Sequence, residues 1–276
     1  MRGAIPIVKM SGAGNDFVVL GPEAIALVGD GVASWARRVC RRGLSVGADG
    51  VLLVTQSSVD RVRVRFLNPD GSETFCGNGS RCAARFAVLQ GMARSPLILE
   101  TAAGEVPAEL AGGTVRLTLP RPEDHGPAVF ERGAERIEGR IIVAGVPHFV
   151  VFVESLSDAP LAVWGPWLRA HPRFGADGTN VDLVRRIDGD TLAIRTWERG
   201  VEGETLACGS GALAAAGAAV EQGWRGRVRV LPASGVPLEV EIGRADAPSS
   251  AILSGDARVV FEGAVAPEGV AGFDAW

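Results

Sequence analysis

The sequence carries one pattern twice, and this repeat limits the folds that the chain can adopt. The segment CGNGSRCAARFAVLQG begins at Cys76 and CGSGALAAAGAAVEQG begins at Cys208, an offset of 132 in a chain of 276 residues. Each copy opens with Cys-Gly-polar-Gly, continues as an Ala-containing apolar stretch and ends in Gln-Gly. Two copies at so long a period indicate a duplicated α/β unit, because solenoids repeat at shorter periods and need at least three copies.

The similarity extends to both sides of the two cysteines. Upstream, RVRVRFLNPDGSETFC and TLAIRTWERGVEGETLAC each predict an alternating strand, a Gly-containing turn and a Glu-Thr step. Downstream, LILETAAGEVPAEL and VRVLPASGVPLEVEI each predict a hairpin, turning at Gly104 and Gly235. Further out, GNDFVVL and GTNVDLV form a looser pair. The repeated unit is therefore a set of strands with one helix in it.

The helix of the second copy indicates how the strands are arranged. GALAAAGAAV is small and apolar on every face, so protein has to surround it, and we expect strands to curl around it. Only its N-terminus can then face a cleft. The predicted fold class is α/β (α+β). We expect two pseudo-symmetric domains, each a mixed, curled β-sheet around a central apolar helix, with the active site in the cleft between them.

The boundary between the two domains is predicted at a proline-rich segment. LPRPEDHGP (Leu119 to Pro127) contains three prolines, which fit poorly into a strand or a helix. We place the N-terminal half at residues 1–120, with residues 264–276 returning to it, and the C-terminal half at residues 121–263.

Composition narrows the class of protein. Hydrophobic residues make up 47% of the chain and charged residues 22%, which is typical of a globular protein with a substantial core. A net charge of −4 argues against non-specific nucleic-acid binding. The start, MRGAIPIVKMSGAGNDF, lacks a signal-peptide core, and the longest apolar run is too short to span a membrane. We expect a cytoplasmic protein with no nucleic-acid or membrane partner.

The reactive residue types are few. Cys40, Cys76, Cys82 and Cys208 are predicted to be thiols, because disulfides are rare in cytoplasmic proteins. There is no Cys-x-x-Cys pair and the three histidines are dispersed, which argues against structural zinc. An enzyme that uses pyridoxal phosphate needs a Schiff-base lysine, and Lys9, the only lysine, lacks a supporting motif. We therefore expect no cofactor.

Two thiols at matched helix starts suggest a specific chemistry. Helix N-termini carry unpaired N–H groups and a positive dipole end, which lower a thiol pKa and attract a carboxylate. If a two-fold axis relates the halves, Cys76 and Cys208 face one tetrahedral carbon from opposite sides. One thiolate removes a proton and the other thiol returns one to the opposite face, which inverts the centre. In the alternative interpretation, both cysteines are packing residues near helix starts, as we expect for Cys40 and Cys82.

Six motifs, in order along the chain, resemble the diaminopimelate epimerase family. They are KMSGAGNDFVVL, GADGVLLV, NPDGSETFCGNGSRC, GVPHFVV, GTNVDLV and ERGVEGETLACGSGA. The resemblance implies that the chain interconverts LL- and meso-2,6-diaminopimelate, without metal or pyridoxal phosphate, in the route to lysine and peptidoglycan. It also implies two similar α/β domains, each with strands around a central helix, and a substrate that lies between them.

The resemblance also implies roles for individual residues. Cys76 and Cys208 correspond to the acid/base thiols. Arg199 corresponds to the residue that binds the distal carboxylate of the substrate, because a guanidinium matches a carboxylate fork. Glu198 would bind an ammonium group, and both it and His148 would support catalysis, His148 by tuning a nearby thiol. The remaining residues implied to bind substrate are Asn15, Asn68, Gly77, Asn78, Asn180, Gly209 and Ser210, of which Gly77–Asn78 and Gly209–Ser210 would hold the reacting carboxylate.

Simpler interpretations of some of these residues remain. Asn68 also fits a plain turn, Asn15 a cap or turn, and Glu198–Arg199 an exposed ion pair. The chain departs from the family pattern at Val146, where many members have Asn, and at Gly50, where some have Gln. The loop from Asn68 to Cys76 is one residue shorter than in many relatives.

Two alternative functions are compatible with the sequence. A proline or hydroxyproline racemase would use the same two-thiol chemistry without a distal carboxylate clamp. A non-catalytic binder of amino acids would need neither cysteine. A homodimer is compatible with the sequence as well.

Overall fold

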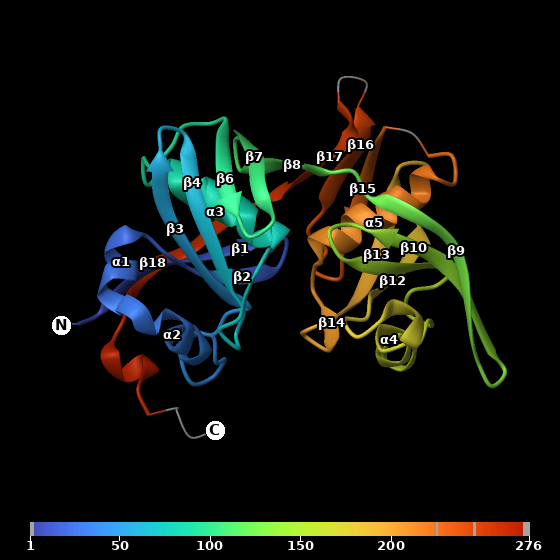
Figure 1. Ribbon diagram of the computed structural model, residues 1–276, viewed down its shortest axis with the longest axis horizontal. Coiled ribbons are helices and arrows are strands. Elements are labelled where there is room, and N and C mark those ends of the chain that lie inside the picture. The colour runs from blue at the N-terminus through green and yellow to red at the C-terminus, as the bar shows by residue number, and fades with distance from the viewer. Residues whose placement is uncertain (1–2, 225, 245–246, 273–276) are drawn as a thin grey trace. The chain divides into compact units, whose positions relative to one another are not determined.

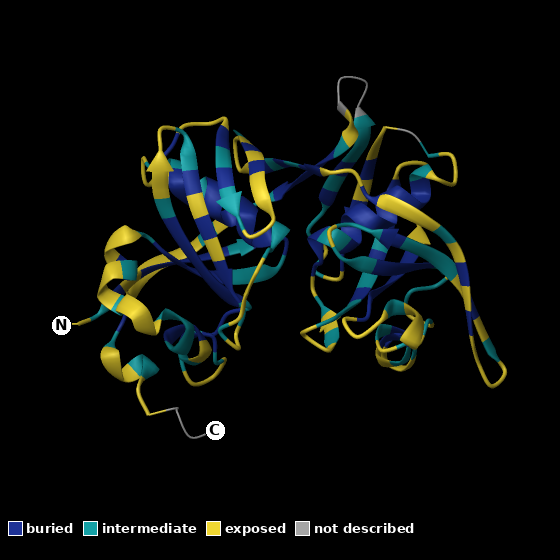
Figure 2. Cartoon of the chain, viewed as in Figure 1, coloured by how far each residue is buried: buried dark blue, intermediate teal, exposed yellow. Residues whose placement is uncertain are grey.

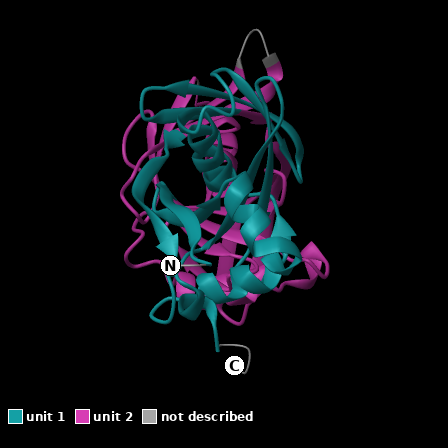
Figure 3. Cartoon of the chain, turned by 90° about the vertical axis from the view of Figure 1, so that its left-hand side faces the viewer, with its two compact units in different colours: residues 1–117, 255–276 teal, residues 118–254 magenta. Residues whose placement is uncertain are grey.

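The computed structural model describes residues 3–224, 226–244 and 247–272 (Figure 1). The chain divides into two compact units, which are residues 1–117 with 255–276 and residues 118–254 (Figure 3). The expected return of residues 264–276 to the first half falls in part on residues 273–276, which lie outside the described residues.

Unit 1 is a curled sheet with helices on both of its faces. Its strands pair in the order β18–β1–β2–β3–β4–β6–β7–β8, with β5 also paired to β4; the β2–β3 and β4–β6 pairs are parallel and the others antiparallel. The elements are β1 (Ile5–Gly12), β2 (Asn15–Leu20), α1 (Pro22–Val28), α2 (Val32–Val39), β3 (Gly50–Ser58), β4 (Arg61–Leu67), β5 (Glu73–Thr74), α3 (Gly77–Leu89), β6 (Leu97–Thr101), β7 (Gly104–Ala111), β8 (Thr114–Pro120) and β18 (Arg258–Val265), with 3-10 turns at Gly29–Gly31 and Pro267–Val270.

Unit 2 repeats this topology. Its strands pair in the order β9–β10–β11–β12–β13–β15–β16–β17, with β14 also paired to β13; here β11–β12 and β13–β15 are parallel and the other pairs antiparallel. The elements are β9 (Glu123–Arg132), β10 (Glu135–Val143), β11 (Pro147–Phe152), α4 (Leu161–Arg169), β12 (Asn180–Arg186), β13 (Thr191–Glu198), β14 (Gly203–Thr205), α5 (Gly209–Val220), β15 (Arg227–Leu231), β16 (Leu238–Arg244) and β17 (Ala247–Asp256), with a 3-10 turn at Pro172–Phe174. The predicted α/β class with pseudo-symmetric halves is confirmed.

The central helix of each unit is buried by strands (Figure 2). Every residue of α5 except Ser210 and Val220 is buried, and strands β9 to β13, β15 and β16 contact it. Its Ala-rich sequence favours helix but offers no polar face to water, which is why it is stable only inside the sheet. Both central helices stop shortly before a glycine with positive φ, Gly91 after α3 and Gly223 after α5.

Each sheet has a second helical layer on its other face. In unit 1, Val18 and Leu20 of β2 join a buried cluster with Trp35 and Val39 of α2. In unit 2, Phe149 and Val151 belong to a similar cluster with residues of α4. Because alternate residues of a strand point to opposite faces, the intervening residues are left to face the central helix. No helix in the described part of the chain combines the length and apolar composition needed to cross a membrane.

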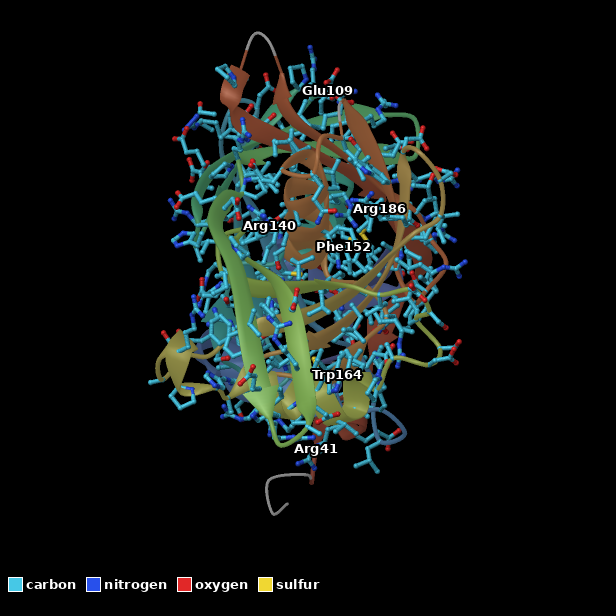
Figure 4. The ribbon with its side chains drawn as sticks, turned by 90° about the vertical axis from the view of Figure 1, so that its right-hand side faces the viewer. Arg41, Glu109, Arg140, Phe152, Trp164 and Arg186 are labelled. Atoms are coloured by element: carbon cyan, nitrogen blue, oxygen red, sulfur yellow. The ribbon has the colours of Figure 1, made fainter. Side chains whose placement is uncertain are left out.

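Trp164 and Arg186 make polar and aromatic contacts between neighbouring elements of unit 2 (Figure 4). The indole Nε1 of Trp164, on α4, donates to Glu135 of β10 at 3.1 Å. The guanidinium of Arg186 lies over the rings of Phe152 and Trp224, at 5.4 and 5.5 Å from their centroids. The first contact joins α4 to β10, and the Arg186 contacts join β11 and β12 to the segment that follows α5.

The expectation that three prolines keep Leu119 to Pro127 out of strands is wrong, although the segment lies beside the division between the units, which falls after Leu117. β8 continues to Pro120 and β9 already begins at Glu123. Pro127 is accommodated inside β9 because it lies opposite Arg140, where the pairing of β9 with β10 shifts register. A bulge is one of the few places where a strand tolerates the missing N–H of proline.

The looser sequence pair, GNDFVVL with GTNVDLV, is also wrong as a structural match. The first contains β2 and the second β12. By strand pairing, β2 corresponds to β11 and β12 corresponds to β3. The two predicted hairpins are confirmed as β6–β7 and β15–β16.

The packing of α4 leads to a stability prediction. A Cβ added at Gly165 would lie 2.6 Å from the ring of Trp197, so Gly165→Ala forces a shift in the core. Overpacking costs about 1–3 kcal/mol and the helix propensity of Ala returns up to about 1 kcal/mol, so we expect a net loss of about 1–2 kcal/mol in urea unfolding. The control is Gly189→Ala, where the added Cβ meets nothing within 4 Å. Equal stability of the two variants would contradict this packing.

Candidate active site

Cys76 and Cys208 are the N-cap residues of α3 and α5. Both have an extended backbone, with φ/ψ of −139°/115° and −117°/116°. The N–H of Gly79 donates to Cys76 Sγ at 3.3 Å, and the N–H of Gly211 donates to Cys208 Sγ at 3.4 Å. Each sulfur therefore takes the place that a capping oxygen usually occupies. The predicted placement of both cysteines at helix starts is confirmed.

In unit 1, an amide network surrounds Cys76. Asn15 Oδ1 lies 3.7 Å from Cys76 Sγ and accepts from Asn78 Nδ2 at 3.4 Å. Asn15 Nδ2 donates to Asp49 Oδ2 at 2.5 Å. Because Asp49 accepts only, the Asn15 amide is held with its oxygen toward Cys76 and Asn78. The structure thus brings together three of the predicted site residues and adds Asp49.

Two basic residues, Lys9 and Arg42, form ion pairs next to this amide network. Lys9 is 6% exposed, and its Nζ lies 2.6 Å from Asp16 Oδ2 and donates to the carbonyl of Gly47. Arg42 pairs with both Asp16 and Asp49. Although burial raises the pKa of Asp16, hydrogen bonds from Arg42 and Lys9 hold it below its usual range. The single lysine of the chain is thus engaged in an ion pair.

A buried guanidinium completes the unit 1 site. Arg81, on α3, is fully buried. Its Nη2 donates to Asn78 Oδ1 at 2.8 Å and its Nε donates to the carbonyl of Asp256 at 3.3 Å. Arg81 therefore fixes the orientation of the Asn78 amide, as Asp49 fixes that of Asn15.

In unit 2, His148 lies in a buried polar chain. Asp182 Oδ2 lies 2.6 Å from His148 Nδ1, and Thr196 Oγ1 donates to Asp182 Oδ1 at 2.7 Å. The carboxylate holds the proton on Nδ1, so that Nε2 accepts from Asn180 Nδ2 at 3.3 Å. Asn180 Oδ1 in turn accepts from the backbone N–H of Arg199 at 2.8 Å.

Two carboxyl groups lie close to Cys208. Ser210 Oγ lies 3.3 Å from its sulfur, and Glu198 accepts a hydrogen bond from the thiol. Burial raises the pKa of Cys208 well above its ordinary value, and Glu198 and Asp182 raise it further. Burial also raises the pKa of Glu198, although the hydrogen bond that Thr205 Oγ1 donates at 3.0 Å lowers it in part. This pocket disfavours negative charge on the thiol.

Other predicted residues have clear local roles. Asn68 lies in the β4–β5 turn, where its Nδ2 donates to Ser72 Oγ at 3.0 Å, as the turn interpretation requires. Cys40, the C-cap residue of α2, and Cys82, inside α3, are buried away from any helix N-cap. Burial raises the pKa of each to about 12, which fits their prediction as packing residues. A Cβ at Gly50 would lie 2.2 Å from the ring of Phe66, so this ring occupies the space of a longer side chain there.

The remaining site residues are placed by the same elements. Gly77 and Asn78 are the first residues of α3, and Gly209 and Ser210 are the first residues of α5. Val146 lies half-buried in the turn before β11. Among residues 3–224, 226–244 and 247–272, no group of three or more His, Cys, Asp or Glu side chains is arranged to hold a metal ion.

The sequence reasoning missed Asp49, Asp182 and Arg81. Each had a signal. Asp182 lies two residues after Asn180, and so on the same face of β12. Asp49 is part of the quoted motif GADGVLLV. Arg81 is a charge within a largely apolar helix, which is uncommon without a buried partner.

The family profile described as diaminopimelate epimerase matches residues 7–120 and 140–260. The chain belongs to the diaminopimelate epimerase family. The diaminopimelate epimerase of Aquifex aeolicus is 37% identical over 273 residues, which cover 94% of this chain and 97% of the relative. That of Desulforudis audaxviator is 41% identical over 275 residues, which cover 92% and 97%. The resemblance carried by the six motifs is confirmed, and the protein is an isomerase.

A solved structure of another epimerase shows the same fold as this member of the diaminopimelate epimerase family. The hydroxyproline epimerase of Agrobacterium vitis, solved with bound trans-4-hydroxy-L-proline, aligns with a TM-score of 0.71 at 18% identity. The alignment covers 97% of this chain and 94% of that one. At this identity the likeness concerns the fold alone.

The raised pKa of Glu198 predicts a pH-dependent stability change. As pH rises past about 4.3, Glu198 ionises first in the unfolded state. Stability therefore falls as pH rises from that value to the higher folded pKa, and it stays lower above the folded pKa. Glu198→Gln removes this cost, and we expect its unfolding free energy relative to the unmodified protein to rise from about pH 4 to pH 7.

Asp188→Asn is the control with the opposite sign. Hydrogen bonds from the backbone N–H groups of Asp190 and Thr191 hold the pKa of Asp188 below its usual value. The stability that Asp188 contributes is present above its unfolded pKa and is lost as pH falls. Urea unfolding at both pH values measures the two variants, and a Glu198→Gln difference that does not vary with pH contradicts the account.

Proposed function

We propose that this protein epimerises LL-2,6-diaminopimelate to meso-2,6-diaminopimelate by acid/base chemistry at Cys76 and Cys208. The observation that carries the proposal is the matched pair of capping thiols, each bonded by the N–H three residues further along its helix. Membership of the diaminopimelate epimerase family supports the substrate. A packing role would account for one such cysteine, but not for the same cap geometry in both copies of a duplicated unit.

The proposed reaction needs two groups that exchange roles. One cysteine, as thiolate, removes the proton from the α-carbon, and the other, as thiol, donates a proton to the opposite face. The resulting centre is inverted and the two sulfurs have exchanged protonation states. In the reverse direction each group takes the other role. The first proton ends on sulfur and exchanges with solvent before the next turnover.

The carboxylate next to this carbon has to accept developing negative charge. In the proposal, the N–H groups of Gly77 and Asn78 and those of Gly209 and Ser210 bind it, because the first N–H groups of a helix have no acceptor within the helix. The dipole of each helix adds to this stabilisation. Fixed donors of this kind stabilise the transition state without reorganising during the reaction.

Recognition of the distal end is assigned to Asn15, Asn68, Asn180 and Arg199. The Asn180 amide is held by His148 and by the N–H of Arg199, so it is preorganised for a substrate contact. Glu198 is assigned to an ammonium group. His148, which bonds Asp182 and Asn180, supports catalysis through Asn180 in this arrangement.

Several further properties belong to the same proposal. The reaction requires neither metal nor pyridoxal phosphate, and it serves lysine and peptidoglycan precursor synthesis in the cytoplasm. A homodimer is included because β18 presents large apolar side chains, Val260 at 55% and Phe261 at 45% exposure. A proline or hydroxyproline racemase uses the same two-thiol chemistry, and substrate profiling separates it from the proposal.

Replacing either thiol tests the proposed chemistry. We expect Cys76→Ala and Cys208→Ala each to lower turnover of LL-diaminopimelate by at least about 100-fold, because acid/base groups contribute about 10²–10⁴ to rate. Turnover is followed by chiral separation of the two isomers. Cys40→Ala and Cys82→Ala are matched controls at buried thiols and retain turnover. Full activity of either capping-cysteine variant, or preference for proline, would overturn the proposal.

A further inference from the structure

The turn between β1 and β2 has a conformation that its sequence does not favour. Gly12 pairs with Asn15, which leaves Ala13 and Gly14 as a two-residue loop. Both loop residues have positive φ, 58° at Ala13 and 97° at Gly14. Such a loop matches the twist of a hairpin, but its first position favours Asn, Asp or Gly, because a Cβ is strained at positive φ. The conformation of Ala13 therefore depends on an interaction outside the loop.

Asp256 supplies this interaction. Ala13 is fully buried, and its N–H donates to Asp256 Oδ1 at 2.6 Å. The other carboxylate oxygen, Oδ2, accepts from Arg258 Nε at 2.6 Å, so Arg258 holds the carboxylate with Oδ1 toward the loop. A hydrogen bond to a charged oxygen is stronger than one between neutral groups, and a buried N–H without an acceptor is costly. This contact therefore favours the strained loop.

The loop determines where Asn15 lies, because Asn15 follows it directly as the first residue of β2. Asn15 Nδ2 donates to Asp49 Oδ2 at 2.5 Å, and Asn15 Oδ1 lies 3.7 Å from Cys76 Sγ. A Cβ added at Gly12 would lie 3.0 Å from the carbonyl oxygen of Asn78, so the turn packs closely against the start of α3. A relaxed loop would move Asn15 away from these contacts.

The main chain of Asp256 supports the second amide of the site. Its carbonyl accepts from Arg81 Nε at 3.3 Å, and Arg81 Nη2 donates to Asn78 Oδ1 at 2.8 Å. Asn78 Nδ2 then donates to Asn15 Oδ1 at 3.4 Å. Asp256 is therefore joined to both amides, to Asn15 through its carboxylate and to Asn78 through its carbonyl.

A purely structural role is the alternative, and Asp124 of unit 2 is a matched example of it. Asp124 Oδ1 accepts from the N–H of Gly126 at 2.9 Å, and its other oxygen pairs with Arg140. The side chains are similarly exposed, at 21% for Asp256 and 19% for Asp124. They differ in what the bonded N–H leads to. Gly126 lies within β9, whereas the loop held by Asp256 leads directly to Asn15.

We infer that Asp256 is a positioning residue of the candidate active site, whose carboxylate holds the β1–β2 loop in the conformation that directs the Asn15 amide toward Cys76. The inference rests on the proposed function for its catalytic meaning, and it adds one residue to the same site. Asp256 acts through the backbone of Ala13 and not by contact with the substrate.

The asparagine side chains report this role in the full chain without substrate. The chain has only four asparagines, and all of them are proposed site residues: Asn15, Asn68, Asn78 and Asn180. Protein made with ¹⁵N-labelled asparagine therefore gives four side-chain NH₂ signals, each assigned by its loss in the corresponding alanine variant. We expect Asp256→Ala to shift the Asn15 NH₂ proton signals upfield, because this amide loses its short hydrogen bond to Asp49.

Two controls separate the hydrogen bond from charge and from a general loss of structure. Asp256→Asn removes the charge but keeps an acceptor for the N–H of Ala13, while the exposed Arg258 turns to water, so we expect the Asn15 signal to stay in place. Asp124→Ala removes the matched carboxylate and leaves all four signals unchanged.

A second variant covers the case in which Asp256→Ala does not fold. Asp256→Ser ends one bond short of Ala13 and lets water solvate its N–H, and we expect the same shift of the Asn15 signal. An Asn15 signal that stays in place in whichever of the two variants folds overturns the inference.

Replacing Ala13 by glycine tests the strain in the loop. Glycine adopts positive φ without a Cβ penalty, so the loop no longer needs Asp256 to the same extent. In the Ala13→Gly background we therefore expect Asp256→Ala to shift the Asn15 signal less than it does in the unmodified loop. A shift of full size in that background would overturn the inference.

Kinetics test the catalytic meaning. Because Asn15 is assigned to substrate recognition, we expect Asp256→Ala to raise KM for LL-diaminopimelate about 3- to 10-fold, with kcat changed by less than about 2-fold. Asp256→Asn and Asp124→Ala retain the KM. In the Asn15→Ala background, Asp256→Ala is expected to raise KM by less than about 2-fold, because residues that act through one another are not additive. Effects that multiply, or an unchanged KM in Asp256→Ala, count against the inference and discard it.

Failure of the proposed function has a different signature. The Asn15 signal is measured without substrate, so it shifts in Asp256→Ala even in a protein that does not turn over diaminopimelate. Turnover of diaminopimelate, together with an Asn15 signal that is the same in Asp256→Ala and in the unmodified protein, retains the function and discards the inference.

Discussion

Each half of the molecule depends on burying a small central helix inside a curled sheet. The residues of α5 are almost all Ala, Gly or Leu, so the helix gains stability only when strands enclose its whole circumference. Enclosure satisfies the interior of the helix but leaves its first N–H groups in need of acceptors. In both units the acceptor at that end is a sulfur. The sulfur proposed as the acid/base group is thus positioned by the same constraint that stabilises the fold.

The composition of the central helices was enough to predict this arrangement. An apolar circumference, glycines at the entry and a cysteine at the cap are local features that can be read along the chain. The strand partners were harder to predict. Phe17-Val18-Val19 in β2 and Phe149-Val150-Val151 in β11 have the same letters, yet Phe17 lies near Gly79 of α3 whereas Phe149 packs in the outer cluster with α4. A shift of one residue exchanges the two faces of a strand, and sequence similarity does not reveal it.

The supporting residues of the site depend on this register, and so they were missed. Asp182 matters because β12 points it at His148 and at the start of α5. Asp49 matters because its carboxylate meets the Asn15 amide across the start of β3. The expectation that the prolines near Leu119 exclude strands failed for a related reason, because proline does not fit a regular strand but is tolerated at a bulge. Residue type supports the proposed chemistry, and strand pairing decides which side chains surround the two cysteines.

The central claim is that two sulfurs serve one stereocentre from opposite faces, and isotope partition tests it most directly. LL-diaminopimelate is incubated with the protein in D₂O to low conversion, and both isomers are isolated and analysed by mass spectrometry. The account predicts deuterium at the inverted centre of the meso product and none in the remaining substrate, with the same asymmetry when the reaction starts from the meso isomer. Product that retains the substrate's own hydrogen would mean that a single base acts on both faces, and would contradict the account.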